Sequence, residues 1–192
     1  MTNKNCIIVH GCPSDKEKAM DRKTRTYDKH WMPWLTKQLN KRGIETYLPL
    51  MPHPWKPSYE DHKKVFKYYT VNQKSILIGH SCGCTFLVRW LGENKINIDK
   101  LILVAPWKVS PGDNDSKLEF YKMTIDPTIK ERINQIYIFT SDNEADEGKE
   151  GLKMYHKSLD GTVINLKSHG HYCYKDMLTE EFPELLNIVL ND

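Results

Sequence analysis

Short apolar runs alternate with longer amphipathic segments along the whole chain. Runs of about four to eight residues rich in Ile, Leu and Val are typical of buried strands, whereas apolar residues three or four positions apart favour helices. The apolar runs predict six strands, at 6–10, 45–48, 75–78, 100–105, 135–140 and 162–167. The amphipathic segments predict helices at 30–42, 58–72, 84–91, 145–159 and 180–190, with one or two short helices before residue 134. This alternation predicts an α/β fold, in which a mostly parallel six-stranded sheet carries helices on both faces.

The ends of the predicted elements carry recognisable signals. Ser58, followed three residues later by Asp61, resembles a capping box that opens a helix, and Gly43 is placed to end the helix at 30–42. Two polar stretches predict loops, from Pro13 to about Lys29 and around residues 111–113. The 192 residues contain no internal repeat or low-complexity stretch, so we expect one domain spanning 1–192.

The composition argues against several classes of protein. The 28 Lys and Arg residues against 25 Asp and Glu residues give a net charge of +3, and the basic residues are spread among acidic ones. A nucleic-acid binding protein would concentrate them in a patch. No apolar run reaches the roughly 18 residues of a membrane span, and the N-terminal run 6–9 is too short for a signal peptide. We therefore expect a cytoplasmic protein that binds neither nucleic acid nor membranes.

The cysteines are odd in number, at positions 6, 12, 82, 84 and 173. Without an export signal, we expect free thiols rather than a disulfide framework. Cys82 and Cys84 lie close to His80, but their spacing is too tight for a zinc knuckle and no second pair completes four ligands. We expect no metal and no cofactor.

The most informative motif is Gly79-His80-Ser81-Cys82-Gly83, which lies between a predicted strand and a predicted helix. Gly-x-Ser-x-Gly in this setting is typical of the nucleophile elbow of α/β-hydrolases. Ser81 would occupy a strained turn over the end of the sheet, where only small residues fit two positions away on either side. Ser81 is therefore the candidate nucleophile.

Parallel sheets of this kind bind ligands beyond the carboxyl ends of their strands, where the strand order reverses. If the first strand lies between the second and third, this crevice falls between Ser81 and the segment His10-Gly11-Cys12. An oxyanion hole there needs backbone N–H groups, and the candidates are those of Cys82, just after the nucleophile, and Cys12. We interpret His10 and His80 as structural residues that hydrogen-bond the neighbouring loops.

A serine needs a histidine to remove its proton, and in this fold the chain order is serine, acid, histidine. Only His156, His169 and His171 follow the fifth predicted strand. His156 lies within a predicted helix and is expected to face solvent. Of the other two, which follow the sixth strand, we favour His171, because Gly170 before it permits a close approach.

The acid is expected to follow the fifth strand, where Asp142, Glu144 and Asp146 lie close together. Some of these carboxylates are explained by the helix that follows, since its N-terminal end favours negative charge. Either Glu144 or Asp142 could orient the histidine and stabilise its protonated form. The residues alone leave this choice open.

At these motifs the chain resembles a known family, the small serine hydrolases grouped with YdeN and the retinoblastoma-binding serine hydrolase. The resemblance covers nearly the whole chain and rests on six segments: Ile7-Ile8-Val9-His10-Gly11, His30-Trp31-x-Pro33-Trp34-Leu35, Ile78-Gly79-His80-Ser81-Cys82-Gly83, Leu103-Val104-Ala105-Pro106, Ser141-Asp142-Asn143-Glu144 and Gly170-His171-Tyr172. It implies a three-layer α/β-hydrolase fold with a minimal lid, Ser81 as nucleophile and His171 as base. The acid of the family falls on Glu144, where most relatives carry Asp.

These observations predict a serine hydrolase that cleaves a small acyl ester through an acyl-enzyme. Trp55, Trp107 and Met51, in loops at the functional edge, and Gly11 beside the nucleophile are candidates to line the substrate pocket. Two alternatives remain: an aminopeptidase or thioesterase with the same triad, or a module that keeps the fold but binds a protein partner. The sequence identifies neither the physiological substrate nor any protein partner.

Overall fold

A computed structural model describes residues 3–13, 16, 30–109 and 117–191. Its centre is a six-stranded sheet, and neighbouring strands are parallel throughout, in the order β2-β1-β3-β4-β5-β6. The strands are β1 (Asn5–Val9), β2 (Glu45–Tyr47), β3 (Ser75–His80), β4 (Ile98–Val104), β5 (Ile133–Ser141) and β6 (Thr162–Leu166). The first strand lies between the second and third, which meets the condition for a crevice between Ser81 and the segment His10-Gly11-Cys12.

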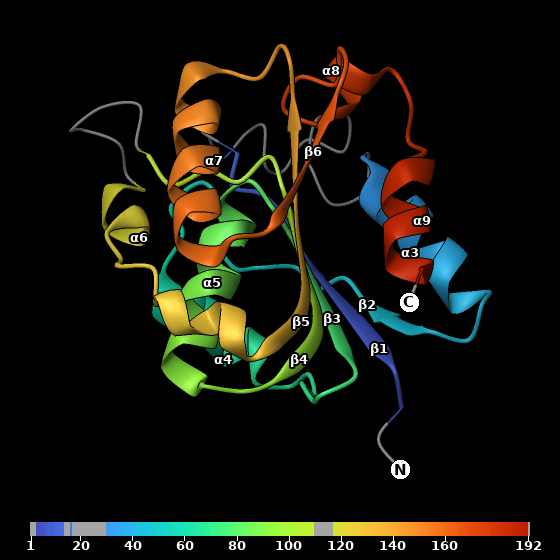
Figure 1. Cartoon of the computed structure of the whole chain (residues 1–192), viewed down its shortest axis with the longest axis vertical. Coiled ribbons are helices and arrows are strands. Elements are labelled where there is room, and N and C mark those ends of the chain that lie inside the picture. Colours follow the sequence, from blue (N-terminus) through green and yellow to red (C-terminus); the bar gives the residue numbers. More distant parts are fainter. Residues whose placement is uncertain (1–2, 14–15, 17–29, 110–116, 192) are drawn as a thin grey trace.

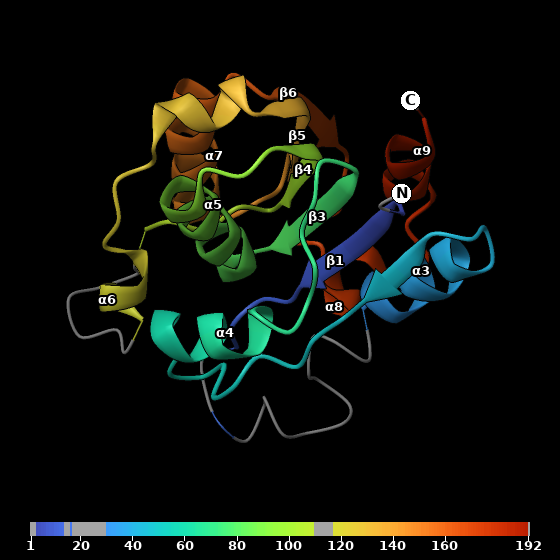
Figure 2. The same ribbon diagram turned by 90° about the horizontal axis from the view of Figure 1, so that it is seen from below.

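Helices cover both faces of this sheet. They are α3 (Trp31–Asn40), α4 (Tyr59–Phe66), α5 (Cys82–Asn94), α6 (Leu118–Tyr121), the 3₁₀ helix η1 (Pro127–Glu131), α7 (Asp146–Leu159), α8 (Tyr174–Met177) and α9 (Pro183–Leu190). Figures 1 and 2 show α3 and α9 together on one side of the sheet, and α4, α5, α6 and α7 on the other. The arrangement confirms the predicted α/β-hydrolase fold.

Each face of the sheet has its own apolar core, because successive residues of a strand point to opposite sides. Leu77 of β3 packs on the α5 and α7 side with Phe86 and Tyr155. Its neighbour Ile78 packs on the other side with Trp31 of α3 and the α9 side chains. Burial on both faces explains why the strands are continuous apolar runs rather than alternating ones.

Several boundaries differ from those that the sequence predicts. Helix α4 ends at Phe66 rather than near residue 72, because Phe66 is its last buried side chain and Tyr68 is 79% exposed. Helix α9 begins at Pro183 rather than 180, since the residue before a proline avoids the helical conformation. The short helix α8 was not predicted. Ser58 does cap α4, its hydroxyl accepting the Asp61 N–H at 3.3 Å.

The predicted loop from Pro13 to Lys29 falls mostly outside the described residues, and the segment 111–113 lies wholly outside them. Among the helices of the described part, none is long and apolar enough to cross a membrane. The carboxyl ends of β1, β3, β5 and β6 lie at the same edge of the sheet, and the candidate residues follow them directly.

Candidate active site

Ser81 occupies the sharp turn between β3 and α5. Its backbone angles, φ 53° and ψ −122°, lie in a region that residues other than glycine rarely adopt. A Cβ on Gly79 would lie 2.7 Å from the Cys84 nitrogen, and one on Gly83 would lie 2.3 Å from the Val9 carbonyl oxygen. Only glycine therefore fits two positions before and two positions after Ser81, as the motif predicts.

Ser81, His171 and Glu144 form a continuous chain of hydrogen bonds. His171 Nε2 lies 2.9 Å from Ser81 Oγ, and His171 Nδ1 lies 2.9 Å from Glu144 Oε2. The Glu144 carboxylate accepts a hydrogen bond, so Nδ1 carries the proton of the neutral ring and Nε2 is free to accept from the serine hydroxyl. The three residues come from the ends of β3, β5 and β6, which are far apart in the sequence.

Glu144, not Asp142, is the carboxylate that reaches His171. Glu144 is only 3% exposed, and its side chain folds back so that Oε1 accepts the Ala145 N–H at 2.8 Å. Gly148, one turn along in α7, makes room for this longer side chain, since a Cβ there would lie 2.7 Å from Glu144 Cδ.

Asp142 instead accepts the Ser168 N–H at 2.8 Å, and this hydrogen bond is the main cause that lowers the pKa of its carboxyl group. Its carboxylate thus ties the start of the histidine loop to the end of β5. We find this role in place of the capping of α7 that an acidic residue here would ordinarily suggest.

The other two candidate histidines lie elsewhere. The backbone N–H of His169 is bound by Ser141 Oγ at 2.9 Å, and its ring packs against Tyr172 and Phe182. His156 lies on α7, where its Nδ1 is 3.0 Å from the Gly161 carbonyl oxygen. Of the three candidates, His171 is the one that contacts Ser81.

Four consecutive residues, the last of β5 and the three that follow it, each contact one of four consecutive residues after β6. Ser141 contacts His169, Asp142 contacts Ser168, Asn143 Oδ1 accepts the Gly170 N–H at 2.8 Å, and Glu144 binds His171. Ser141 Oγ also donates to Asn143 Oδ1 at 2.6 Å. We call these paired segments, 141–144 and 168–171, the loop clamp. The clamp fixes the backbone that carries the histidine.

Three further residues, from different parts of the chain, contact His171. His80 Nε2 donates to the His171 carbonyl oxygen at 2.9 Å, and Asp176 Oδ2 accepts the His171 N–H at 3.2 Å. The Trp107 ring lies edge-on to the His171 ring, with centroids 4.9 Å apart. Burial lowers the pKa of His80 well below its ordinary value, and the nearby His171 adds to this. A neutral His80 therefore acts as a fixed hydrogen-bond donor.

The loop after β1 lies directly against the nucleophile. A Cβ on Gly11 would lie 3.1 Å from Ser81 Cβ, so this glycine allows the close approach. His10 donates from Nδ1 to the Gly11 carbonyl oxygen at 2.7 Å and accepts the Met51 N–H at Nε2, 2.9 Å away. Met51 is fully buried in the core, which contradicts its candidacy as a pocket residue.

The expectation of free thiols throughout is wrong, because a disulfide joins Cys12 to Cys82. The bond spans 70 positions of sequence, and its Cα atoms lie 5.8 Å apart because β1 and β3 are neighbouring strands that bring both residues to one edge. An odd number of cysteines gives no sign of such a pair. Cys6, Cys84 and Cys173 are free.

Trp107 lies against His171, the candidate base, whereas Trp55 packs on His53.

Sequence reasoning did not foresee the contacts that Asn143, Ser141, Asp176 and Gly148 make at the site. A run of four polar residues directly after a strand, and a glycine in the first turn of a helix, were the available signals for three of them. The described residues contain no cluster of three or more His, Cys, Asp or Glu side chains that could hold a metal ion.

Comparison with known proteins points to one family. The model of a family described as Serine hydrolase matches residues 24–189. YdeN of Bacillus subtilis strain 168, described as a hydrolase, is 36% identical over 80 residues, which make up 40% of this chain and only 42% of that protein.

Solved structures show the same fold. The crystal structure of the ydeN product from B. subtilis superposes with a TM-score of 0.83 at 22% identity, over 97% of both chains. A YdeN-like hydrolase from Pectobacterium atrosepticum gives a TM-score of 0.61 at 17% identity, over 96% of this chain and 88% of that one.

Proposed function

Because the chain belongs to the serine hydrolase family, we propose that it cleaves a small acyl ester through an acyl-enzyme on Ser81. The observation that carries the proposal is the hydrogen-bond chain from Glu144 through His171 to Ser81, with both bonds at 2.9 Å. This geometry matches the nucleophile, base and orienting acid of a serine hydrolase triad.

In the first half of the reaction, Ser81 Oγ attacks the acyl carbon while its proton moves to His171 Nε2. Glu144 stabilises the imidazolium that forms and keeps the ring in the productive orientation, without itself taking the proton. His171 then passes the proton to the leaving alcohol, and the acyl group remains on Ser81.

The negative charge on the acyl oxygen needs N–H donors. Cys82 is the first residue of α5, so its N–H has no acceptor within the helix, and the positive end of the helix dipole is at the same place. The second donor that we propose is the Cys12 N–H, since the loop that contains it packs against Ser81 through Gly11.

In the second half, water enters in place of the alcohol. His171 removes a proton from the water, which attacks the acyl carbon, and Ser81 recovers its proton as the acid product leaves. The same groups serve both halves, so the proposed reaction requires no cofactor.

An ester is the proposed substrate because an alcohol leaves more readily than an amine, so an ester makes the smallest demand on these groups. Trp107, which packs on His171, is the side chain that we propose to contact the acyl group. An amide or thioester substrate would use the same atoms.

The test is a comparison of wild-type protein with Ser81→Ala. We expect a fluorophosphonate probe to label only the wild-type protein, and short-chain p-nitrophenyl esters to be hydrolysed at least about 10⁴-fold more slowly by the variant. A panel that includes an aminoacyl amide and an acyl thioester ranks the substrate classes. If the folded variant keeps more than about a tenth of the wild-type activity, Ser81 is not the nucleophile.

A further inference from the structure

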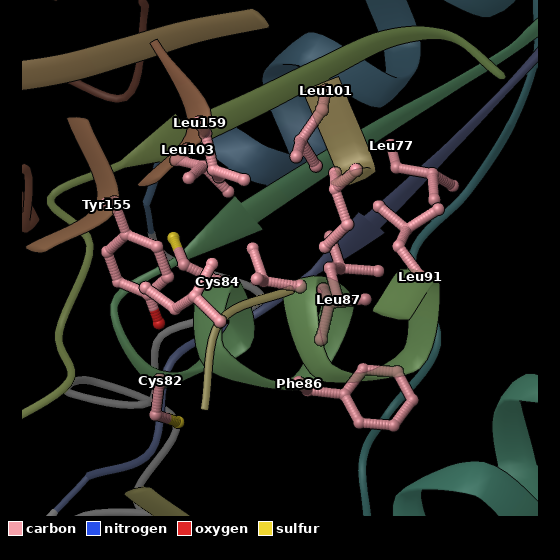
Figure 3. Close-up of a cluster of buried hydrophobic side chains, with 14 of the residues drawn as sticks. Leu77, Cys82, Cys84, Phe86, Leu87, Leu91, Leu101, Leu103, Tyr155 and Leu159 are labelled. Atoms are coloured by element: carbon pink, nitrogen blue, oxygen red, sulfur yellow. The ribbon is translucent and has the colours of Figure 1, made fainter. Parts of the chain in front are cut away.

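The disulfide joins the two residues whose N–H groups form the proposed oxyanion hole. Cys82 begins α5 and follows Ser81, and Cys12 lies three residues beyond the end of β1. In Figure 3, Cys82 lies at the start of α5, at the margin of the buried cluster and apart from the leucine side chains. The bond therefore sits at the catalytic edge rather than in the centre of the core.

The sheet already holds the chain together at this place without the bond. β1 and β3 pair in parallel through Val9 and Gly79, which are each three residues before a cysteine of the pair. Gly83 also packs directly on the Val9 and His10 carbonyl groups. The residues after Gly11 lie beyond the last paired residues of β1 and β3. The disulfide therefore fixes a part of the loop that the strand pairing does not hold.

Among the described residues, a covalent bond and a hydrogen bond from outside its own loop hold Cys12. One is the disulfide on its side chain, and the other is Lys117 Nζ, which donates to the Cys12 carbonyl oxygen at 2.7 Å. The Cys12 N–H belongs to the Gly11–Cys12 peptide, one bond before the Cα that carries the disulfide, and the carbonyl of this peptide accepts from His10 Nδ1 at 2.7 Å. Breaking the disulfide removes the attachment at the Cys12 Cα and leaves the His10 contact before it and the Lys117 contact after it.

We propose that the Cys12–Cys82 disulfide positions the oxyanion hole, and that a dithiol reductant lowers kcat by breaking it. This inference rests on the function proposed above. It makes Cys12 and Cys82 positioning residues through their side chains, in addition to their backbone role, and it makes turnover depend on the redox state of one bond.

The chemistry of reduction is a two-electron exchange. A thiolate of the dithiol attacks Cys12 Sγ, since Cys12 is partly exposed whereas Cys82 is only 1% exposed. The S–S bond breaks, the Cys82 thiolate leaves, and the mixed disulfide on Cys12 is resolved by the second thiol of the reductant. The protein ends with two thiols and the reductant with one disulfide. The first turn of α5 stabilises the leaving thiolate.

The experiment measures ester hydrolysis before and after treatment with dithiothreitol, with free thiols counted in parallel. We expect three free thiols to become five, and kcat to fall between about tenfold and a hundredfold with KM changed less than about twofold, because a transition-state donor is misplaced. Reoxidation should restore kcat. The melting temperature, recorded in both states, identifies the range in which the reduced protein is folded.

Three variants distinguish the loss of the disulfide from other effects of the reductant on the protein. Cys12→Ser, Cys82→Ser and the double variant each remove the same bond, so all three should match the reduced wild-type protein and ignore dithiothreitol. Cys6→Ala is the matched control, since Cys6 is free and lies within β1, and its variant should respond to the reductant like the wild type.

The oxidised protein could be active and contain the disulfide, and yet show the same kcat after the bond is reduced. That result would overturn this inference and leave the proposed function standing. A higher kcat after reduction, or five free thiols in the oxidised protein, would overturn it equally. If neither redox state reacts with a fluorophosphonate at Ser81, the proposed function itself has failed.

Discussion

At the scale of single residues, the direction in which each side chain leaves the turn after β5 decides which carboxylate contacts His171. Asp142 and Glu144 are two positions apart, yet Asp142 binds the Ser168 N–H and Glu144 binds His171. The longer side chain fits because it folds back onto the Ala145 N–H over the bare Cα of Gly148. A glutamate in place of the more frequent aspartate is therefore compatible with a working triad.

Glu144→Gln should lower kcat by about 10² to 10⁴, because the neutral amide keeps the shape but no longer stabilises the imidazolium. Asp142→Asn should change kcat by less than about threefold, since the amide oxygen can still accept the Ser168 N–H. Steady-state kinetics of both purified variants checks this ranking. The reverse ranking would move the acid two residues upstream.

Gly148→Ala should lower kcat by about tenfold or more, although alanine favours the helix by roughly 1 kcal/mol over glycine. The added Cβ would lie 2.7 Å from both Glu144 Cγ and Cδ, so the carboxylate must shift away from His171. Kinetics together with thermal melting separates the two effects. Lys149→Ala, at the neighbouring position of α7, is the control and should leave kcat unchanged.

At the scale of elements, the site depends on two loops that hold each other. The loop clamp joins the ends of β5 and β6, and the three contacts besides the Glu144–His171 bond involve no reacting atom. These contacts fix the backbone next to His171 independently of the side chains of the triad. The clamp explains why Ser141, Asp142 and Asn143 accompany the acid in sequence.

Asn143→Ala should lower the free energy of unfolding by about 1–3 kcal/mol, because it removes the partner of the Gly170 N–H and of the Ser141 hydroxyl. We expect kcat to fall by about tenfold, less than for Glu144→Gln, since the triad side chains remain. Urea denaturation and ester kinetics measure the two quantities. Asn134→Ala, at the exposed start of β5, should change neither; equal losses in the two variants would refute a specific role for the clamp.

At the scale of the whole molecule, neutral histidines buried across the fold link stability to pH. Burial lowers the pKa of His10, of His80 and of His62, the last to about 4. The unfolded chain takes up protons near pH 6.5, where the folded chain does not. Their contribution to stability is therefore complete above about pH 6.5 and is lost as the pH falls toward the folded values.

The free energy of unfolding should accordingly fall by up to about 1.4 kcal/mol per pH unit from His62 between about pH 6.5 and 4, and His10 and His80 act in the same direction. His62 packs between the rings of Phe86 and Phe120, so His62→Phe should fold and show a slope shallower by about this amount. Urea denaturation between about pH 7.5 and 4.5 measures the slopes. His53→Phe, at an exposed position, is the control; a slope unaltered by His62→Phe would contradict the assignment.

The sequence by itself determined the alternation of strands and helices and the Gly-x-Ser-x-Gly motif at Ser81, and it favoured His171 over His169 as the candidate base. These follow from local rules: apolar periodicity within an element, the need for glycine beside a strained serine, and the order of triad residues along the chain. Among the elements, the errors lie at places such as the end of α4, where the last side chain to reach the core sets the boundary, and at the unpredicted helix α8. Outside the elements, the expectations of free thiols and of a pocket role for Met51 were wrong.

The residue types alone left Glu144 and Asp142 open, and the resemblance favoured Glu144; the tertiary structure shows that Glu144 contacts His171. Only the tertiary structure revealed the contact of Asn143 with Gly170 and the bond between Cys12 and Cys82. The choice between the two acids depends on the directions that a turn gives to neighbouring side chains, which residue type alone does not encode. The disulfide and the clamp depend on which strands are adjacent in the sheet, since adjacency brings together residues separated by 70 and by about 27 positions. Contacts of this kind are properties of the folded chain, and they are the ones that align the proposed nucleophile, base and oxyanion donors.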